Sequence, residues 1–402
     1  MPTNRQLHQV VVVGAGVAGI RATETLRQNG YDGALTIVGA ERHAPYHRPP
    51  LSKKLLSGQV HRAGIDMAPQ FDTDARMFRG ATAVGLDMSA RTIQVRDDGQ
   101  NLSLSFDGLV IASGAQPREW PGGRTPDGVL MLRTVEDCLA IRERLRSRPR
   151  VVVVGGGFIG AEVAATCRLM GLDVTLIEKA TGPLVQALGD ELAPRWAELH
   201  RQRGVDLRVG VGVDAFVGNG HVEGVRLTDG SQVPADVVIV GLGVTPATDW
   251  LEGSGLRLDD GVVCDATGAA EGCDDIVAAG DVARWWHPLY ERHLRTEHWD
   301  DAGRQGAAAA RTLLAGPDHA EAVDMVPYFW SDQYDVKVQM IGTPADYDAI
   351  EIIEGDGGEW EFVAAYGRGG RTIAVLGTIP NRVHAYRDAI SNRAEFPPKQ
   401  PD

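Results

Sequence analysis

Two stretches of the chain share one order of apolar and polar positions. Residues 10–41 read VVVVGAGVAGIRATETLRQNGYDGALTIVGAE, and residues 151–178 read VVVVGGGFIGAEVAATCRLMGLDVTLIE. Each begins with a run of valines, passes through a glycine-containing turn into a segment with helical spacing, and ends in a second apolar run closed by glutamate. The pattern predicts strand, helix and strand in both places. We call these stretches the first motif and the second motif.

Both motifs carry the spacing G-x-G-x-x-G between strand and helix, which is typical of a dinucleotide-binding site. The first glycine allows the tight turn, the second lets the backbone approach a pyrophosphate, and the third lets helix and strand pack closely. Free N–H groups at the helix N-terminus can then bind the phosphates. Glu41 and Glu178 end the following strands, where a carboxylate can accept hydrogen bonds from a ribose. The glycines are Gly14, Gly16 and Gly19 in the first motif, and Gly155, Gly157 and Gly160 in the second.

Further apolar strands followed by glycine-containing turns are predicted at residues 109–117, 235–246 and 273–283. The last of these is capped by Gly280 and Asp281, where a carboxylate would meet a helix N-terminus. Alternating apolar and polar positions predict hairpins or meanders at residues 84–108 and 201–233.

The last quarter of the chain has a different pattern. A helix is predicted at residues 303–316, stopped by Gly316 and Pro317. From about residue 321 the alternation returns and predicts an antiparallel sheet of three to five strands with a final helix near residues 380–392. The tail from residue 394 is expected to be disordered.

Composition narrows the class of protein. The chain has 402 residues, enough for two or three domains, and no apolar run approaches the roughly 20 residues of a membrane span. The polar N-terminus passes straight into a strand, so we expect no signal peptide and a cytoplasmic protein. A net charge of −14 argues against nucleic-acid binding. No set of His, Cys and Asp residues has metal-ligand spacing, so no metal is expected.

The cysteines exclude one class of mechanism. Cys138, Cys167, Cys264 and Cys273 form no C-x-x-C pair. We expect buried thiols in a reducing compartment, without a redox-active disulfide.

The order of motifs, strands and the Gly280-Asp281 turn resembles the flavoproteins with two dinucleotide-binding domains, over essentially the whole chain. The resemblance implies an α/β fold with two Rossmann-like domains, glutathione-reductase-like and three-layered, plus a small α+β C-terminal domain. FAD would occupy the first motif and NAD(P)H the second. The implied domains are a discontinuous FAD-binding domain of residues 1–115 and 245–320, an NAD-binding domain of residues 116–244, and a C-terminal domain of residues 321–402.

Within these flavoproteins, several stretches are similar to ferredoxin reductases of bacterial oxygenase systems, the putidaredoxin-reductase-like family. They read YHRPPLSK, LRTVEDC, GGGFIGAEVAAT, EHWDDAGRQG and PYFWSDQYDVKVQMIG. The absence of a cysteine pair, and of a cysteine in ERHAPYHRPPLSK, separates the chain from thiol-relay members. The resemblance implies hydride transfer from NADH to FAD and then single electrons to a two-iron, two-sulfur ferredoxin that serves a cytochrome P450 or a ring-hydroxylating oxygenase.

The resemblance also implies roles for individual residues. Lys53, near the flavin N5, would pair with Glu162, and these two are the candidate catalytic residues. Asp281 would bind the flavin ribityl chain, Val84 the adenine, and Trp299 and Trp330 would lie at the flavin. The cofactor-binding residues implied are Gly14, Gly16, Ala18, Gly19, Glu41, Arg42, Arg48, Lys53, Val84, Ala112, Gly114, Arg133, Gly280, Asp281, Trp299 and Trp330, together with Gly155, Gly157, Phe158, Ile159, Gly160, Glu178, Gly243 and Glu297.

Three functional questions stay open at this point. Glu178 favours NADH because it would repel a 2′-phosphate, although Lys179 could soften that repulsion. Docking of the partner is expected to use exposed cations, with Arg284, Arg292 and Arg295 as candidates. The alternatives to a ferredoxin reductase are a rubredoxin reductase, an NADH diaphorase acting on a quinone or oxygen, or an NADH-gated binding protein similar to apoptosis-inducing factor.

Overall fold

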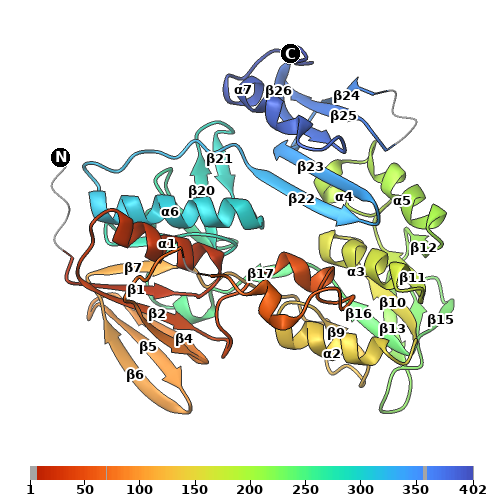
Figure 1. Ribbon diagram of the computed structural model, residues 1–402, viewed down its shortest axis with the longest axis horizontal. Helices are drawn as coiled ribbons and strands as arrows, with labels where there is room; N and C mark the ends of the chain where they lie inside the picture. The colour runs from red at the N-terminus through yellow and green to blue at the C-terminus, as the bar shows by residue number, and fades with distance from the viewer. Residues whose placement is uncertain (1–6, 69, 356–359, 402) are drawn as a thin grey trace. The chain divides into compact units, whose positions relative to one another are not determined.

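The computed structural model describes residues 7–68, 70–355 and 360–401. Its chain divides into two compact units, each containing one of the two motifs (Figure 1). Unit 1 consists of Met1–His47, Asp66–Gln116 and Thr245–Pro327. Unit 2 consists of Arg48–Ile65, Pro117–Val244 and Tyr328–Asp402. The chain therefore passes between the units five times, and two of these passages lie in β8 (Ala115–Pro117) and β17 (Val244–Pro246).

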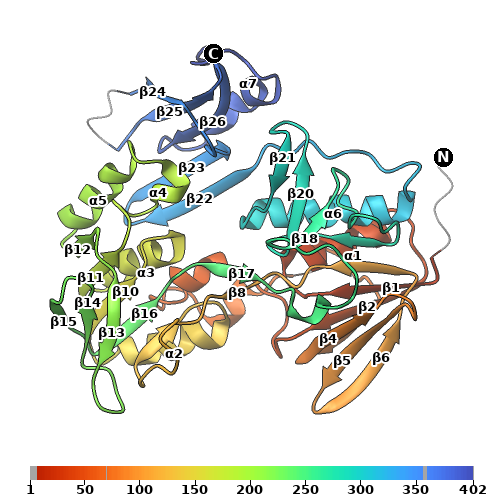
Figure 2. The ribbon, with the colours of Figure 1, turned by 180° about the vertical axis from the view of Figure 1, so that it is seen from behind.

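Unit 1 has three layers. Its central parallel sheet has the order β19-β7-β1-β2-β3, with the first motif at its centre. Helices α1 and α6 cover one face, and the antiparallel sheet β4-β5-β6 lies on the other (Figures 1 and 2). The bounds are β1 (Gln9–Val13), α1 (Val17–Gln28), β2 (Ala34–Gly39), β3 (Arg76–Arg79), β4 (Ala81–Asp87), β5 (Thr92–Asp97), β6 (Gln100–Ser105), β7 (Gly108–Ile111), β19 (Ile276–Ala278) and α6 (Trp299–Ala315). A small sheet of β18 (Val262–Cys264), β20 (Ala283–His287) and β21 (Arg292–Leu294) and the 3₁₀ helix η3 (Asp249–Leu251) complete this unit.

The two helices of unit 1 approach one another closely because α6 has a glycine where they meet. A Cβ built on Gly306 would lie 2.1 Å from the Ala18 carbonyl oxygen, so any larger residue would separate the helices. The valines of β1 are fully or almost fully buried between the layers. This packing explains their run in the sequence, since a central parallel strand is covered on both faces.

Unit 2 contains a second parallel sheet, in the order β12-β11-β10-β16-β9, and an antiparallel sheet β13-β14-β15. The bounds are β9 (Val129–Met131), α2 (Val135–Leu145), β10 (Arg150–Val154), α3 (Phe158–Leu169), β11 (Asp173–Glu178), α4 (Val185–Leu188), α5 (Ala193–Gln202), β12 (Asp206–Val209), β13 (Val213–Val217), β14 (Gly224–Leu227), β15 (Gln232–Pro234) and β16 (Val237–Val240). Two 3₁₀ helices, η1 (Pro49–Ser52) and η2 (Arg62–Ile65), also belong to this unit.

The C-terminal part of unit 2 is a five-stranded antiparallel sheet in the order β22-β23-β26-β25-β24. Its bounds are β22 (Tyr328–Gln333), β23 (Val336–Gly342), β24 (Ala349–Glu354), β25 (Val363–Arg368) and β26 (Arg371–Gly377), followed by η4 (Arg382–Tyr386) and α7 (Arg387–Ser391). The predicted fold class, two Rossmann-like parts and a smaller C-terminal part, is confirmed. The predicted domain boundaries remain predictions.

Three local expectations were wrong in part. Residues 201–233 are not all hairpin, because β12 joins the parallel sheet and only β13 to β15 form the meander. The final helix is a 3₁₀ turn followed by the short α7. The tail from residue 394 is packed rather than disordered: the Phe396 ring covers Gly367, and the Pro401 carbonyl accepts a hydrogen bond from Arg382 at 2.8 Å. No helix in the described residues is long and apolar enough to cross a membrane.

Candidate functional site

Two glycines of the first motif lie so close to other backbone atoms that neither position has room for a side chain. Gly14 has φ +117°, and a Cβ there would lie 2.0 Å from the Ala112 carbonyl oxygen at the end of β7. A Cβ on Gly19 would lie 1.9 Å from the Gly14 carbonyl oxygen. The protein's own backbone therefore requires glycine at these two positions.

Gly16 differs from its two neighbours in the motif. It is the N-cap of α1, its φ of −77° is open to any residue, and a Cβ built on it has no atom within 4 Å. No described part of the protein requires glycine at this position. A ligand approaching the N-terminus of α1 would require it, because its phosphate oxygens need direct access to the backbone N–H groups.

The second motif repeats this geometry. A Cβ on Gly155, at φ +97°, would lie 2.2 Å from the Gly241 carbonyl oxygen, and a Cβ on Gly160 would lie 1.9 Å from the Gly155 carbonyl oxygen. Gly157 caps α3 with φ −67° and again has no atom within 4 Å of a built Cβ. The two motifs thus present the same unfilled space at the same helix end. Gly241, whose backbone makes the contact, was missed in the sequence.

Glu178 is held in place by the backbone around it. Its Oε2 accepts a hydrogen bond from Gly156 N at 2.6 Å, and its Oε1 accepts one from Ala180 N at 2.7 Å. Each carboxylate oxygen keeps a further lone pair. The carboxylate is therefore oriented beside the glycine turn and can still accept from a ribose hydroxyl.

In unit 1 the residues around the first motif come from three separate segments. Gly280 N donates to Gln305 Oε1 at 2.9 Å, and a Cβ on Gly280 would lie 3.1 Å from Cβ of Ala18. Strand β20, not a helix, follows the Gly280-Asp281 turn along the chain. The helix ends beside this turn are the first turns of α1 and α6, which contain Ala18 and Ala302. Glu41 accepts a hydrogen bond from the Tyr46 hydroxyl at 2.5 Å.

Other expected residues of unit 1 are spread around these segments. The rings of Trp299 and His47 lie 5.3 Å apart. Arg42 pairs with Asp98 at 2.7 Å, with both side chains exposed. Val84 is one of the few exposed large apolar residues. Ala112 and Gly114 follow β7, and Gly114 O accepts from Ala247 N at 2.9 Å.

Lys53 and Glu162 meet inside unit 2, as expected from the sequence. Lys53 Nζ donates to Glu162 Oε1 at 2.8 Å, and the side chains are 17% and 6% exposed. Ser52 Oγ donates to Glu162 Oε2 at 2.5 Å, and Ser331 Oγ donates to Oε1 at 2.8 Å. Ser52 and Ser331 lie within the stretches YHRPPLSK and PYFWSDQYDVKVQMIG, but nothing in those stretches indicates that their hydroxyls bind Glu162.

Helix α3 brings these groups together. It begins at the second motif, and Thr166, one turn after Glu162, donates from Oγ1 to the Ser52 carbonyl oxygen at 2.8 Å. Positions four apart lie on the same helix face, so Glu162 and Thr166 both bind Ser52 of η1 from one face of α3. The inward side of β22 packs on α3, with the rings of Phe158 and Phe329 4.8 Å apart.

Several other expected residues of unit 2 surround this cluster. Arg48 Nη1 donates to the Arg133 carbonyl oxygen at 2.7 Å. Trp330 is half-buried on β22 and stacks with Tyr328, with ring centroids 6.0 Å apart. Ile159 is 43% exposed in the first turn of α3. Gly243, at φ +86°, accepts a hydrogen bond from Arg118 N at 3.0 Å.

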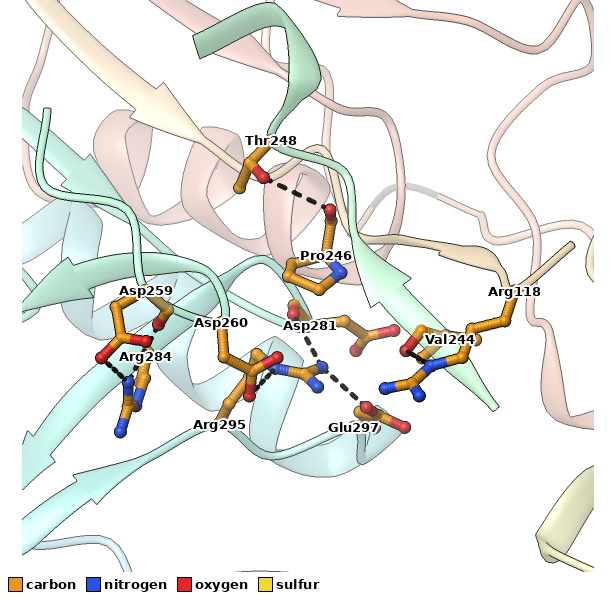
Figure 3. Close-up of polar contacts among 10 residues, drawn as sticks. All are labelled: Arg118, Val244, Pro246, Thr248, Asp259, Asp260, Asp281, Arg284, Arg295 and Glu297. Carbon is orange, nitrogen blue, oxygen red and sulfur yellow. Dashed lines mark hydrogen bonds and ion pairs between the residues drawn. The ribbon is translucent and has the colours of Figure 1, made fainter. Parts of the chain in front are cut away.

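Arg284 and Arg295, two of the expected docking cations, pair with carboxylates in the structure. Arg295 is only 10% exposed; it donates to Glu297 at 2.6 Å, to Asp260 at 3.1 Å and to the Asp281 carbonyl (Figure 3). Arg284 pairs with Asp259 (Figure 3). The expectation that Arg295 is an exposed docking cation was therefore wrong, because its side chain is nearly buried and pairs with two carboxylates. The same contact pairs Glu297, an expected cofactor-binding residue, with Arg295.

No two cysteines pair in the structure. Cys138, Cys167 and Cys264 are buried, and Cys273 is partly buried. Burial raises the pKa of the Cys138 and Cys167 thiols to about 12. These thiols are protonated at neutral pH, so they cannot act as nucleophiles.

Comparison with known proteins agrees with this geometry. Residues 8–306 match the family model of pyridine nucleotide-disulphide oxidoreductases, and residues 328–401 match the reductase C-terminal model. The chain is 34% identical to putidaredoxin reductase from Pseudomonas putida, covering 91% of this chain and 87% of that one. It is 36% identical to the ferredoxin–NAD(+) reductase component of the anthranilate 1,2-dioxygenase system from Burkholderia cepacia, covering 97% and 96%.

The solved structures include one of the same kind. The covalent putidaredoxin reductase–putidaredoxin complex superposes with a TM-score of 0.89 at 31% identity, covering 96% of this chain and 93% of that one. Together with the paired glycine motifs, these matches establish that the chain belongs to the pyridine nucleotide-disulphide oxidoreductase family and carries the reductase C-terminal domain at residues 328–401.

Proposed function

We propose that this protein is an FAD-containing, NADH-dependent ferredoxin reductase that acts in the cytoplasm. The observation that carries the proposal is the pair of open positions at Gly16 and Gly157. Each is a glycine that no described protein atom requires, and each lies at a helix N-terminus suited to a pyrophosphate. Two such positions in one chain fit two dinucleotides.

FAD is assigned to the first motif and NADH to the second. Glu41 and Asp281 would hold the flavin nucleotide in unit 1, and Glu178 would accept from the NADH ribose in unit 2. A bound flavin supplies the chemistry that the side chains lack, because it converts a two-electron hydride donor into a source of single electrons. Lys53, paired with Glu162, would place positive charge where reduction builds negative charge. The remaining expected cofactor contacts, including Arg48, Arg133, Trp299 and Trp330, stay proposals.

The electron acceptor is proposed from the relatives. Their names describe ferredoxin–NAD(+) reductases of dioxygenase systems and a reductase captured with putidaredoxin. By that likeness we propose a two-iron, two-sulfur ferredoxin as the partner and a cytochrome P450 or ring-hydroxylating oxygenase as the next component. The buried, protonated cysteines support direct transfer from the flavin, because no thiol relay is available in the described chain.

The test places one methyl group at each open position. Gly16→Ala should leave the fold intact and lose FAD on purification. Gly157→Ala should keep FAD but need about tenfold more NADH for half-maximal rate of anaerobic flavin bleaching, because the methyl occupies the phosphate position. Gly64→Ala is the control, since Gly64 is exposed, has no positive φ and has only Val60 within 4 Å of a built Cβ.

The wild-type protein provides the reference for this test. It should bleach rapidly with NADH and much more slowly with NADPH, and the reduced protein should then reduce a two-iron, two-sulfur ferredoxin. A wild-type protein that cannot be loaded with FAD would overturn the proposal. Loss of FAD in Gly157→Ala but not in Gly16→Ala would reverse the cofactor assignment. Fast bleaching followed by slow turnover with every acceptor would favour an NADH-gated binding protein.

A further inference from the structure

The hydroxyl of Ser331 has its direction fixed by its neighbours. Ser331 and Gln333 lie two positions apart on the inward side of β22 and are 0% and 1% exposed. Gln333 Nε2 donates to Ser331 Oγ at 3.2 Å. A hydroxyl has a single proton, so with one lone pair occupied by Gln333 its proton is available for Glu162. The 2.8 Å contact to Glu162 Oε1 is where that proton lies.

The buried polar groups continue from Gln333 toward α5. His200 is fully buried, and its Nδ1 lies 2.9 Å from the Tyr334 hydroxyl. Neither Gln333 Oε1 nor His200 Nε2 has a hydrogen-bond partner among the described residues. Interaction with Gln333 nevertheless opposes the lowering of the His200 pKa by burial. The two side chains therefore lie close enough to influence one another.

Lys53 has two carboxylates within reach, and Ser331 affects only one of them. Lys53 Nζ lies 2.8 Å from Glu162 and 4.0 Å from Asp332, and Asp332 is also 3.3 Å from Lys337. The hydroxyls of Ser52 and Ser331 spread the negative charge of Glu162 over two further donors. A carboxylate that shares its charge with neutral donors neutralises a neighbouring ammonium less completely.

We propose that Ser331, oriented by Gln333, is a positioning residue of the C-terminal sheet that sets how strongly Glu162 neutralises Lys53. The inference rests on the proposed function, because its test measures a bound flavin. In this arrangement Ser331 of β22 binds the Glu162 carboxylate of α3, which also binds Ser52 and Lys53. The midpoint potential of the flavin then depends on a hydroxyl 169 positions from Glu162.

The test compares Ser331→Ala with Ser331→Thr in the FAD-loaded protein. Removing the hydroxyl should draw Glu162 toward Lys53, lower the flavin midpoint potential in an equilibrium dye titration, and slow reduction by saturating NADH by about tenfold, the value of one hydrogen bond to a charged group. Ser331→Thr keeps a hydroxyl and should restore both properties. In a Glu162→Gln background, Ser331→Ala should have little further effect on the potential, since the hydroxyl acts through the carboxylate.

Thr372→Val is the matched control, because Thr372 is also a buried hydroxyl of the C-terminal sheet and donates to the Glu395 carbonyl at 3.1 Å. It should lower the melting temperature without changing the potential. Equal potentials in wild type and Ser331→Ala, or equal shifts in Ser331→Ala and Thr372→Val, would overturn the inference. If the wild-type protein binds no FAD or is not bleached by NADH, the proposed function itself fails, so the two failures are distinguishable.

Discussion

At the scale of single residues, loss of water on burial shifts the pKa of ionisable side chains and so decides which of them can react. The clearest case is the thiols, since the family's name refers to disulphide chemistry. Burial raises the pKa of every one of the four cysteines, and to about 12 for Cys138 and Cys167. At pH 8 a thiol with a pKa of 12 is ionised in only about one molecule in ten thousand. The cysteines of this chain thus serve packing.

This predicts that alkylation leaves the folded protein active. Incubation of the FAD-loaded protein with iodoacetamide at pH 8 should leave Cys138, Cys167 and Cys264 unmodified by mass spectrometry, and NADH-dependent flavin bleaching should be unchanged. The same treatment in urea should modify all four thiols, which serves as the control. Rapid modification of Cys138 with loss of bleaching would show that a reactive thiolate takes part after all.

At the scale of elements, helix α3 links the second motif to the segment that carries Lys53. Glu162 and Thr166 lie on one face, and the Thr166 hydroxyl donates to the Ser52 carbonyl oxygen, both residues being buried. We expect Thr166→Val, which keeps the shape and removes the donor, to cost about 1–3 kcal/mol in urea unfolding, since a buried carbonyl loses its partner. Amide exchange of residues 51–56 should become faster in this variant.

The matched control for this element is Thr181→Val. Thr181 is exposed, and its hydroxyl donates to Asp190 at the surface, so its loss should change the free energy of unfolding by less than about 0.5 kcal/mol. If the two variants unfold at the same urea concentration, the Thr166–Ser52 hydrogen bond contributes nothing measurable, and the contacts of Ser52 and Lys53 with Glu162 join η1 to α3.

The same elements show what a sequence can and cannot predict. The glycine motifs are readable because their spacing is set within a few residues: Gly14 and Gly19 contact one another within one turn. The Ser331–Glu162 contact joins residues far apart in the chain, and a buried serine in an alternating strand has no distinguishing pattern. The packed tail was missed for a similar reason, because Phe396 covers a glycine in another strand.

At the scale of the whole molecule, two effects of pH oppose one another. The sequence has a net charge of −14 and a pI near 5.3, so acidification toward pH 5 reduces self-repulsion and favours the folded state. Three histidines have the opposite effect, because their protonation on acidification favours the unfolded chain. Burial is the main cause that lowers the pKa of His47, His200 and His287, and for His200 the value is about 4.

The histidine effect should dominate between pH 6.5 and pH 4. In this window the unfolded chain binds a proton at His200 while the folded chain does not, so stability present above pH 6.5 is lost as the pH falls toward 4. At pH 5 the loss from His200 alone is about 2 kcal/mol, and about 3 kcal/mol at pH 4. We therefore expect urea unfolding to show a less stable protein at pH 5 than at pH 7.5, although its net charge is closer to zero.

His200→Gln separates the two effects. It removes the buried titrating group, so the variant should be less stable than wild type at pH 7.5 but should lose about 2 kcal/mol less on going to pH 5. His221→Gln, at an exposed position, should follow the wild-type profile. A wild-type protein that is most stable near pH 5 would contradict this prediction and would mean that relief of charge repulsion outweighs protonation of the buried histidines.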